Sequence, residues 1–412
     1  MPKVPLEGIR IIDLGRIYAG PLATRLLADL GAEVIRVEPP WGRGELPGPG
    51  PDYPDGEPGE RPYNRLAFYN ELNRNKYAIC LDLAKAEGRE VFLRLVRVSD
   101  VVAENFSPRV LENLRLDYPH LQEVRSDIIL VSISAYGRTG PYRNYIGFGP
   151  QVEALAGHLK LVGYPDELGA GVAYADAAAG ALAAFATLLA LRYRKLTGQG
   201  VHLDLSMLEA LSFLLAGELL DWTISGRRPE PRGNSHPHQA PHGCYRCRGE
   251  DRWVVIAVSG EKEWRALCQA MGRPELAEDG RFSTSFQRKQ HEEELNQLLE
   301  EWTRVHDPGE VMWLLQGAGV ACGVVQNPAE LLSDPHLRER GFLEEVTHPE
   351  AGTHPHPGAP WKLGDTRPRL RPAPCFAEHN QYVLRGLLGM SSEELELLQK
   401  RKVIASSPLR LE

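Results

Sequence analysis

The stretch IRIIDLGRIYAGPLATRLLADLGAEVIRVE, residues 9–38, decides the fold of this chain. Residues 9–14 form a short apolar run typical of a buried strand, and residues 22–30 carry apolar side chains at helical spacing. Gly31 ends that helix, since glycine readily adopts the left-handed conformation that closes helices, and residues 33–38 predict a second strand. Two strands connected through a helix in this way run parallel, so the stretch predicts a β-α-β unit.

The same alternation of strand and helix continues along the chain. Further strands are predicted at residues 77–81, 100–104 and 128–133, with a helix at 88–98 and another from about residue 109. Strands separated by helices indicate a doubly wound α/β sheet, whose ligands lie at the carboxyl ends of the strands. The loops at that edge are residues 15–21, 105–108 and 134–142.

The second half of the chain changes character. A helix of small residues at 177–191 and a strand at 201–205 are followed by residues 226–243, which are rich in Pro, Gly and His and break all periodicity. We place a domain boundary there. Strand and helix alternate again on a smaller scale over residues 245–325, and residues 340–376 predict an extended return path before a last helical piece.

Composition limits the possible functions. A chain of 412 residues with 42% hydrophobic and 25% charged residues predicts two globular domains, and a net charge of −8 argues against a nucleic-acid partner. The first residues lack the apolar core of a signal peptide, and no uninterrupted apolar stretch reaches transmembrane length, so no membrane partner is predicted. Six scattered cysteines are too sparse for a disulfide framework, which favours a cytoplasmic protein.

Asp176 is the residue that points most clearly to chemistry. It directly precedes the small-residue helix, where backbone N–H groups favour an ionised carboxylate. Aspartate is also a common helix N-cap, and position alone favours that structural role by about two to one. Cations near the strand ends, Lys76 and Arg138 among them, would suit an anionic cofactor, although each alone could equally be a solvated surface charge.

Other chemistries receive little support. The glycine-containing loop at residues 15–21 is neither a G-x-G-x-x-G nor a P-loop sequence and on spacing alone is a tight turn. Cys244 and Cys247 lie near three histidines but lack a second pair at zinc spacing, so no metal site is predicted. No G-x-S-x-G nucleophile motif is present in the sequence.

An ordered set of short motifs resembles the family III CoA-transferases, the group that contains formyl-CoA transferase and carnitine CoA-transferase, with the α-methylacyl-CoA racemases as relatives. Each motif is weak alone, but the ordered set is specific and runs nearly end to end. The motifs are residues 6–10, 19–21, 30–39, 73–76, 104–108, 136–142, 198–200, 233–234, 334–337, 340–342, 358–360 and 378–380.

The resemblance implies a doubly wound, Rossmann-like large domain built from both ends of the chain, a small α/β domain, and two interlocked subunits. A homodimer is expected, with a heteromer containing a related subunit as the alternative. The expected segments are the CoA-binding and catalytic part of the large domain at residues 1–225, the small domain with its linkers at 226–330, and the return segment with the C-terminal part of the large domain at 331–412.

The resemblance also implies where coenzyme A lies. The expected contacts are Tyr18 and Ala19 in the first loop, with Lys76, Asn105, Phe106 and Arg138 nearby. Two basic residues that often contact CoA in the family do not carry over, because Pro39 and Asn113 occupy those positions. CoA is expected as a substrate, and no permanently bound cofactor or metal is needed.

In transferases of this type the residue that matches Asp176 attacks an acyl-CoA thioester. The products are a mixed anhydride and a free thiolate, and only an anhydride keeps the acyl group activated enough for the thiolate to return. An aspartyl-CoA thioester follows, and a carboxylic acid acceptor then takes the CoA. Succinate-like dicarboxylates are a weaker hypothesis, for which Arg16, Arg138, Arg143 and His158 are candidates to bind a second carboxylate.

Two alternatives stay open at this point. In the racemases a similarly placed Asp works with a His in an Ala-Gly-His-Asp-like motif, but the matching position here is Phe148, which cannot transfer a proton unless His158 substitutes for it. The second alternative is a non-catalytic CoA-binding subunit of a heteromeric transferase. Retention of Asp176 argues against it.

Overall fold

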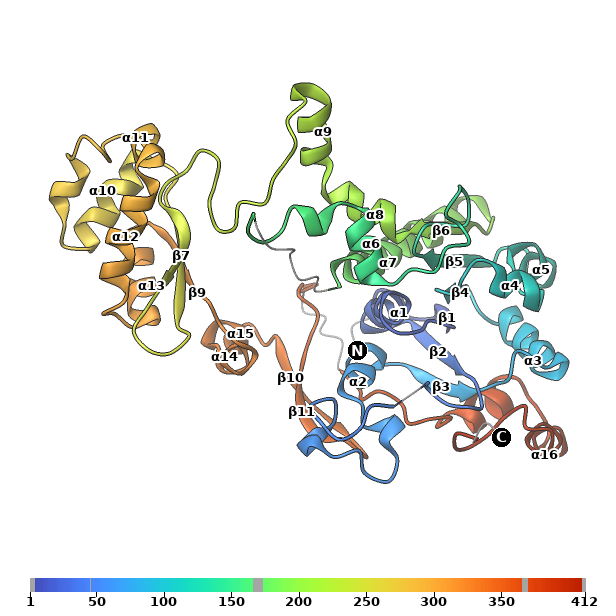
Figure 1. Ribbon diagram of the computed structural model, residues 1–412. Coiled ribbons are helices and arrows are strands. Elements are labelled where there is room, and N and C mark those ends of the chain that lie inside the picture. The colour runs from blue at the N-terminus through green and yellow to red at the C-terminus, as the bar shows by residue number, and fades with distance from the viewer. Residues whose placement is uncertain (1–3, 45, 166–172, 365–369, 410–412) are drawn as a thin grey trace. The chain divides into compact units, whose positions relative to one another are not determined.

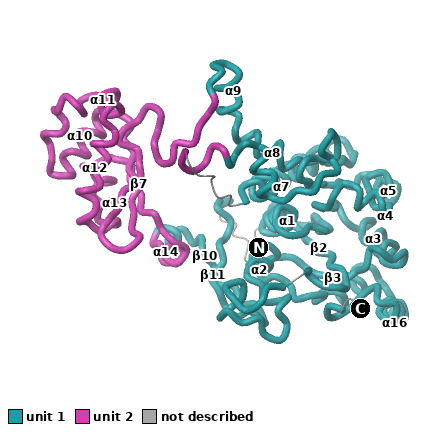
Figure 2. Tube along the Cα trace, viewed as in Figure 1, with its two compact units in different colours: residues 1–159, 171–227, 336–412 teal, residues 160–170, 228–335 magenta. Residues whose placement is uncertain are grey.

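The computed structural model divides the chain into two compact units (Figures 1 and 2). It describes residues 4–44, 46–165, 173–364 and 370–409. The larger unit contains the described residues up to 159, from 173 to 227 and from 336 onward, and the smaller unit contains residues 160–165 and 228–335. Residues 160–165 join the smaller unit through a hydrogen bond from Gly233 N to Gly163 O (2.8 Å), a pairing that the sequence did not predict.

The larger unit is built on a six-stranded parallel sheet in the order β3-β2-β1-β4-β5-β6. Its strands are β1 (Arg10–Asp13), β2 (Glu33–Glu38), β3 (Tyr77–Cys80), β4 (Val101–Glu104), β5 (Ile129–Ser134) and β6 (His202–Ser206). The order reverses between β1 and β4, and such a switch point is where doubly wound sheets bind ligands. The predicted α/β fold is therefore confirmed.

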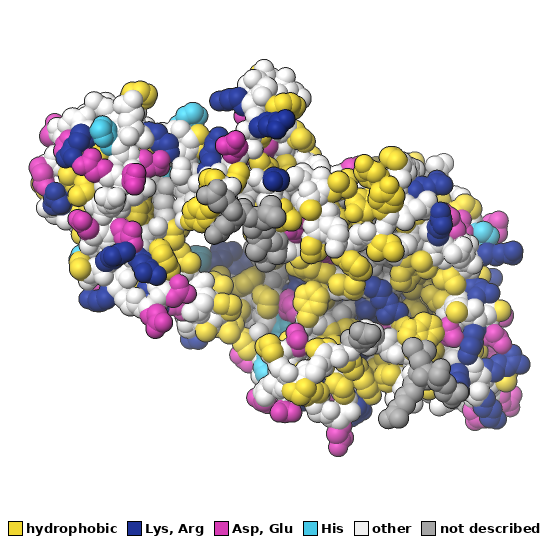
Figure 3. Space-filling model, in the orientation of Figure 1, with side chains coloured by type: hydrophobic (Ala, Val, Ile, Leu, Met, Phe, Trp, Pro, Cys, Tyr) yellow, Lys and Arg dark blue, Asp and Glu magenta, His cyan; other side chains and the backbone are white. Residues whose placement is uncertain are grey.

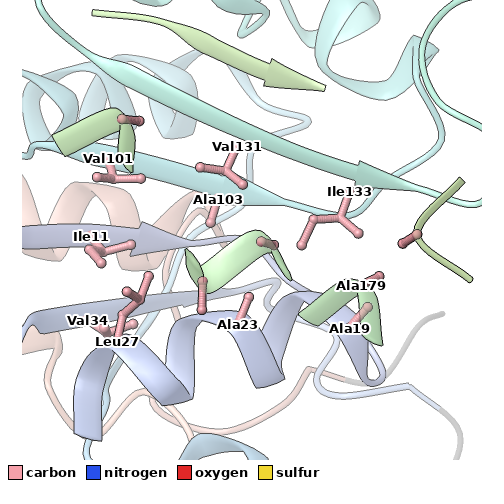
Figure 4. Close-up of a cluster of buried hydrophobic side chains, with 14 of the residues drawn as sticks. Ile11, Ala19, Ala23, Leu27, Val34, Val101, Ala103, Val131, Ile133 and Ala179 are labelled. Atoms are coloured by element: carbon pink, nitrogen blue, oxygen red, sulfur yellow. The ribbon is translucent and has the colours of Figure 1, made fainter. Parts of the chain in front are cut away.

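Both faces of the middle of this sheet are buried, which explains the continuous apolar runs in β4 and β5. Successive side chains of a strand point to opposite faces, so Ile11 and Val34 belong to one buried cluster while Ile12 and Ile35 belong to the other. Figure 4 shows the first cluster, in which Ile11 lies against Leu27 and its neighbours.

Helices cover the two faces. Packed into the first cluster are residues of α1 (Ala19–Asp29), α6 (Gly149–Leu155), α7 (Tyr174–Thr197) and α8 (Met207–Leu214). Packed into the second are residues of α3 (Ala86–Arg97), α4 (Arg109–Leu114), α5 (Tyr118–Val124) and α16 (Ser392–Lys400). This unit also contains α2 (Ala67–Asn73), α9 (Ala216–Ser225) and a π-helix at Gln381–Leu387.

The helix that carries Asp176 begins earlier than predicted. The expected start was residue 177, but α7 starts at Tyr174, so Asp176 is in the first turn and is not the N-cap. By length and composition α7 could cross a membrane, although its uninterrupted apolar stretch ends at Arg192. Its packing gives a different reason for that composition, because Ala175, Ala179 and Ala183 are fully buried in the first cluster.

The C-terminal part of the chain returns to the larger unit. A hairpin of β10 (Leu343–His348) and β11 (Gly352–Pro357) leads back, although residues 365–369 of the predicted return path lie outside the described residues. His379 and Asn380 then bond the backbone of the edge strand β3, where Asn380 Oδ1 accepts from Cys80 N (2.9 Å). Val383 and Leu398 complete the second buried cluster.

The smaller unit has its own sheet and core. Strands β7 (His242–Arg246), β8 (Trp253–Ala257) and β9 (Ala321–Val324) form an antiparallel sheet in that order. Its helices are α10 (Glu261–Ala270), α11 (Ser285–Gln290), α12 (Glu292–Thr303), α13 (Pro308–Gly317) and α14 (Pro328–Ser333), and α15 (Pro335–Glu339) follows at the boundary. Trp264 and Phe282 are buried at its centre and pack edge to face.

Candidate active site

A pocket of about 440 Å³ opens at the carboxyl end of the parallel sheet. Loops that follow β1, β4 and β5 line it, together with the start of α6 and the first turn of α7. Four of the predicted site residues meet there: Tyr18, Asn105, Phe106 and Asp176. The topology explains this meeting, because parallel strands deliver their following loops to one edge of the sheet.

The first loop is held in a tight and strained form. Asn105 fastens it, since its Oδ1 accepts from Arg16 N (2.6 Å) and its Nδ2 donates to Arg16 O (2.9 Å). The absence of a side chain on Gly15 lets the two ends of the loop lie close together, because a Cβ there would lie 2.9 Å from atoms of Gly20 and Pro21. Ile17 has a positive φ of 58°, which is unfavourable for a β-branched residue, and lines the pocket.

Asp176 lies where the beginnings of two helices converge. It is half-buried in the first turn of α7, close to the backbone of Ala19, the first residue of α1. Burial raises the pKa of Asp176 above its ordinary value, the nearby backbone N–H of Ala19 opposes this, and nearby Glu153 raises it further. Ala19 itself is buried and contributes its backbone.

Space for the Asp176 carboxylate depends on Gly149, which the sequence did not mark as important. A Cβ on Gly149, the first residue of α6, would lie 2.4 Å from Asp176 Oδ2. Only the absence of a side chain leaves room for that oxygen. A glycine at a helix start gives no signal in a single sequence, so this requirement became visible only in three dimensions.

Two cations line the pocket without carboxylate partners among the described residues. Arg16 and Arg143 both line it, and neither guanidinium lies within 4.0 Å of a carboxylate oxygen of the described residues. Burial, reinforced by the neighbouring Arg36, lowers the pKa of Arg16 to about 10, so it stays positively charged at neutral pH. An anionic ligand would therefore find unneutralised positive charge here.

A second pocket of about 210 Å³ adjoins the first. It shares Arg16 and Phe106 with the first pocket and is otherwise mostly apolar, with Leu14, Trp41 and Leu81 among its lining residues. The two pockets together offer an elongated ligand a path along the ends of β1, β2, β3 and β4.

Lys76 and Arg138 line neither pocket. The Lys76 ammonium is fully buried and bonds Asp13 (2.9 Å), Pro21 O (2.9 Å) and Asn73 (3.0 Å), and burial lowers its pKa to about 8. The Arg138 guanidinium bonds Pro108 O (2.8 Å) and Glu112 (3.1 Å) and lies 3.6 Å from Glu104. Their expected contact with CoA therefore stays a prediction, and the structure gives both side chains partners within the protein.

The structure gives little support to a racemase or to a metal site. Phe148 lines the pocket, whereas His158, the alternative proton donor, does not. Within the part of the chain that the structure describes, no three His, Cys, Asp or Glu residues form a group that could hold a metal ion.

The chain matches one family of known proteins over most of its length. Residues 6–380 match the family described as CoA-transferase family III. The chain is 34% identical to a succinyl-CoA–D-citramalate CoA-transferase of Chloroflexus aurantiacus, over 98% of this chain and 99% of the relative. It is 33% identical to a succinyl-CoA–L-malate CoA-transferase alpha subunit from the same organism, over 98% and 93% of the two chains.

A solved structure shares the fold. A CAIB/BAIF family protein from Brucella suis superposes with a TM-score of 0.84 at 32% identity, over 93% of this chain and 99% of that one. The fold and the pocket therefore define an α/β enzyme. The chain belongs to CoA-transferase family III.

The Gly149 contact yields a direct test. Gly149→Ala should lower kcat by roughly 100-fold, because the new methyl group displaces the carboxylate by an ångström or more. The unfolding midpoint should stay near the wild type, since alanine suits a helix. Gly217→Ala in α9 is the matched control, because a Cβ there meets nothing within 4 Å. Wild-type kcat in Gly149→Ala would show that the contact does not constrain Asp176.

Because Glu104 is buried beside the pocket, we expect the unfolding free energy of the protein to depend on pH. Its Oε2 accepts from Phe106 N (2.7 Å), and burial raises its pKa to about 7. A folded-state pKa above the unfolded value of 4.5 means that stability is lost as pH rises through about 7. Between pH of about 5 and 8 the wild type should lose about 3 kcal/mol of unfolding free energy relative to Glu104→Gln.

Denaturant unfolding at several pH values measures this difference. Glu112→Gln is the matched control, because Glu112 also pairs with Arg138 but its side chain is 57% exposed. If the unfolding free energies of the wild type and Glu104→Gln changed with pH in parallel, the raised pKa of Glu104 would be contradicted.

Proposed function

We propose that this protein transfers coenzyme A from an acyl-CoA to a carboxylic acid, through covalent intermediates on Asp176. The observation that carries the proposal is the position of Asp176. It is a half-buried carboxylate of raised pKa at the meeting of two helix starts, in a pocket lined by two arginines that have no carboxylate partner among the described residues. A carboxylate that is neither salt-bridged nor fully solvated is available as a nucleophile.

Coenzyme A would lie along both pockets. Its nucleotide suits the smaller pocket, whose apolar walls can take a base while Arg16 faces the phosphates. The pantetheine arm would then pass Phe106 into the larger pocket, where Tyr18 packs edge to face against Phe68 at 5.3 Å. The thioester would reach Asp176 at the far wall.

The proposed reaction conserves atoms and charge at every step. The Asp176 carboxylate attacks the thioester carbonyl, the C–S bond breaks, and CoA leaves as a thiolate beside a mixed anhydride. The thiolate attacks the aspartyl carbonyl of that anhydride, which gives aspartyl-CoA and releases the donor carboxylate. The acceptor carboxylate repeats these two steps in reverse, so Asp176 is restored without net proton transfer or redox change.

The protein's contribution to these steps is positioning and electrostatics. The nearby backbone N–H of Ala19 favours the ionised form of Asp176, and the absence of a side chain on Gly149 leaves Asp176 Oδ2 free of steric conflict. Partial burial raises the nucleophilicity of the carboxylate, because water solvates it less completely.

The acceptor is proposed to be a dicarboxylate. Arg143 is exposed in the loop after β5, lines the pocket, and has no carboxylate partner among the described residues, so it could bind the carboxylate that does not react. The names of the two relatives support this class, since citramalate and malate both carry two carboxylates.

We also propose a homodimer. The larger unit exposes large apolar side chains on α7, α8 and α9, among them Phe185, Leu189, Phe213 and Ile224, and Figure 3 shows hydrophobic side chains on this part of the surface. A monomer rarely leaves so many exposed together. A heteromer with a related subunit is the alternative, because one relative is named an alpha subunit.

The nucleophile can be tested directly. After incubation with succinyl-CoA and treatment with hydroxylamine, intact-protein and peptide mass spectrometry should find a modified carboxyl at Asp176 in the wild type. Asp176→Asn should show no adduct and lose CoA exchange by at least about 1,000-fold, since an amide is a very poor nucleophile. Absence of any adduct, with loss of stereochemistry at the α-carbon of a 2-methylacyl-CoA, would instead support the racemase.

The acceptor class has its own test. Arg143→Gln should raise the KM for succinate by roughly 10- to 100-fold, because one charge-assisted pair is lost. The KM for butyrate, which lacks the second carboxylate, should not change and serves as the internal control. Equal effects on both acids, or faster transfer to monocarboxylates by the wild type, would contradict a dicarboxylate acceptor.

A further inference from the structure

A second carboxylate is buried directly behind the nucleophile. Glu153 on α6 is 0% exposed, and its Oε1 accepts a hydrogen bond from Ala175 N (3.4 Å), the residue before Asp176. Gly149 and Glu153 are four residues apart on α6 and therefore share one face of that helix. One face of α6 thus makes room for the Asp176 side chain and holds the backbone that precedes it.

This carboxylate is incompletely neutralised. Its Oε2 has no hydrogen-bond partner among the described residues, and the nearest basic atom is His158 Nδ1 at 3.8 Å, which also lacks a partner. Buried polar atoms are usually satisfied, so an orphaned pair next to a nucleophile requires an explanation. Neither residue lines the pocket, which argues against direct contact with substrate.

We propose that Glu153 is a positioning residue for the reaction at Asp176. It fixes the first turn of α7 through Ala175 and places a second negative charge behind the nucleophile. Two nearby carboxylates repel each other, and acylation of Asp176 removes one of the two charges. Glu153 therefore favours the anhydride and the aspartyl-CoA thioester over free Asp176. This inference rests on the proposed function, since it requires an acylated Asp176.

The other groups around Glu153 leave this charge effect in place. From α7 it faces Asp176 and the neighbouring Tyr174, whose ring packs edge to face on His158 at 5.2 Å. The one charged residue of α8, Glu209, is exposed. Among the residues that the structure describes, His158 is the one nearby group that could offset the charge, and its distance of 3.8 Å is beyond a hydrogen bond.

Glu153→Gln tests the proposal, because glutamine keeps the acceptor for Ala175 but loses the charge. We expect kcat to fall by roughly 10- to 100-fold with an unchanged Kd for CoA. The acidic limb of the plot of kcat/KM against pH should move to lower pH, because removing a like charge lowers the pKa of Asp176. Glu209→Gln is the matched control and should behave as wild type.

Wild-type kcat and an unmoved acidic limb in Glu153→Gln would overturn the proposal. If that variant does not fold, Glu153→Asp replaces it. The charge remains in this variant, so the acidic limb of the plot of kcat/KM against pH must stay at the wild-type position. An acidic limb shifted to lower pH would contradict the proposal. Labelling of Asp176 in the wild type is measured first. Its absence would refute the transferase function itself, whereas labelled wild type with an unaffected variant refutes only the role of Glu153.

Discussion

The close contact between α1 and α7 is the constraint on which the site depends. Gly180 of α7 leaves no room for a side chain, because a Cβ there would meet Leu22 at 2.9 Å and Ala19 O at 3.0 Å. Small residues therefore let the beginnings of the two helices come together. That approach brings Asp176 close to the backbone of Ala19 and beside the first loop, so the small residues of α7 determine where the Asp176 carboxylate lies.

A buried charge network forms the base beneath that loop. Arg36 and Lys76 both pair with Asp13, at 3.5 and 2.9 Å, and Arg43 pairs with Glu38 at 2.7 Å, all with side chains at most 5% exposed. Arg36 also donates to Gly15 O (2.9 Å), which ties the network to the loop. Buried pairs of this kind are costly to break, so the network holds the first loop in place.

The sequence predicted the sheet well because its signals are local. Apolar runs broken by glycine located all six parallel strands within about two residues, and loops that follow parallel strands must meet at one edge. Asp176 was recognised from its place before a small-residue helix and from the family resemblance. Side-chain partners were not predictable. The sequence showed no partner for Lys76 or Arg138, because both form hydrogen bonds with groups far along the chain. Gly149 and Glu153 were missed because their importance lies in what a neighbouring helix places against them.

The central claim is that the Asp176 carboxylate exchanges an oxygen with each acid that the enzyme processes. Turnover of succinyl-CoA with an acceptor acid labelled with ¹⁸O in its carboxylates tests this directly, with peptide mass spectrometry of the protein and of the released succinate. The account predicts one heavy oxygen at Asp176 and, after further turnovers, heavy oxygen in the succinate. Unlabelled Asp176 and succinate, while the acceptor still becomes its CoA thioester, would contradict the covalent route.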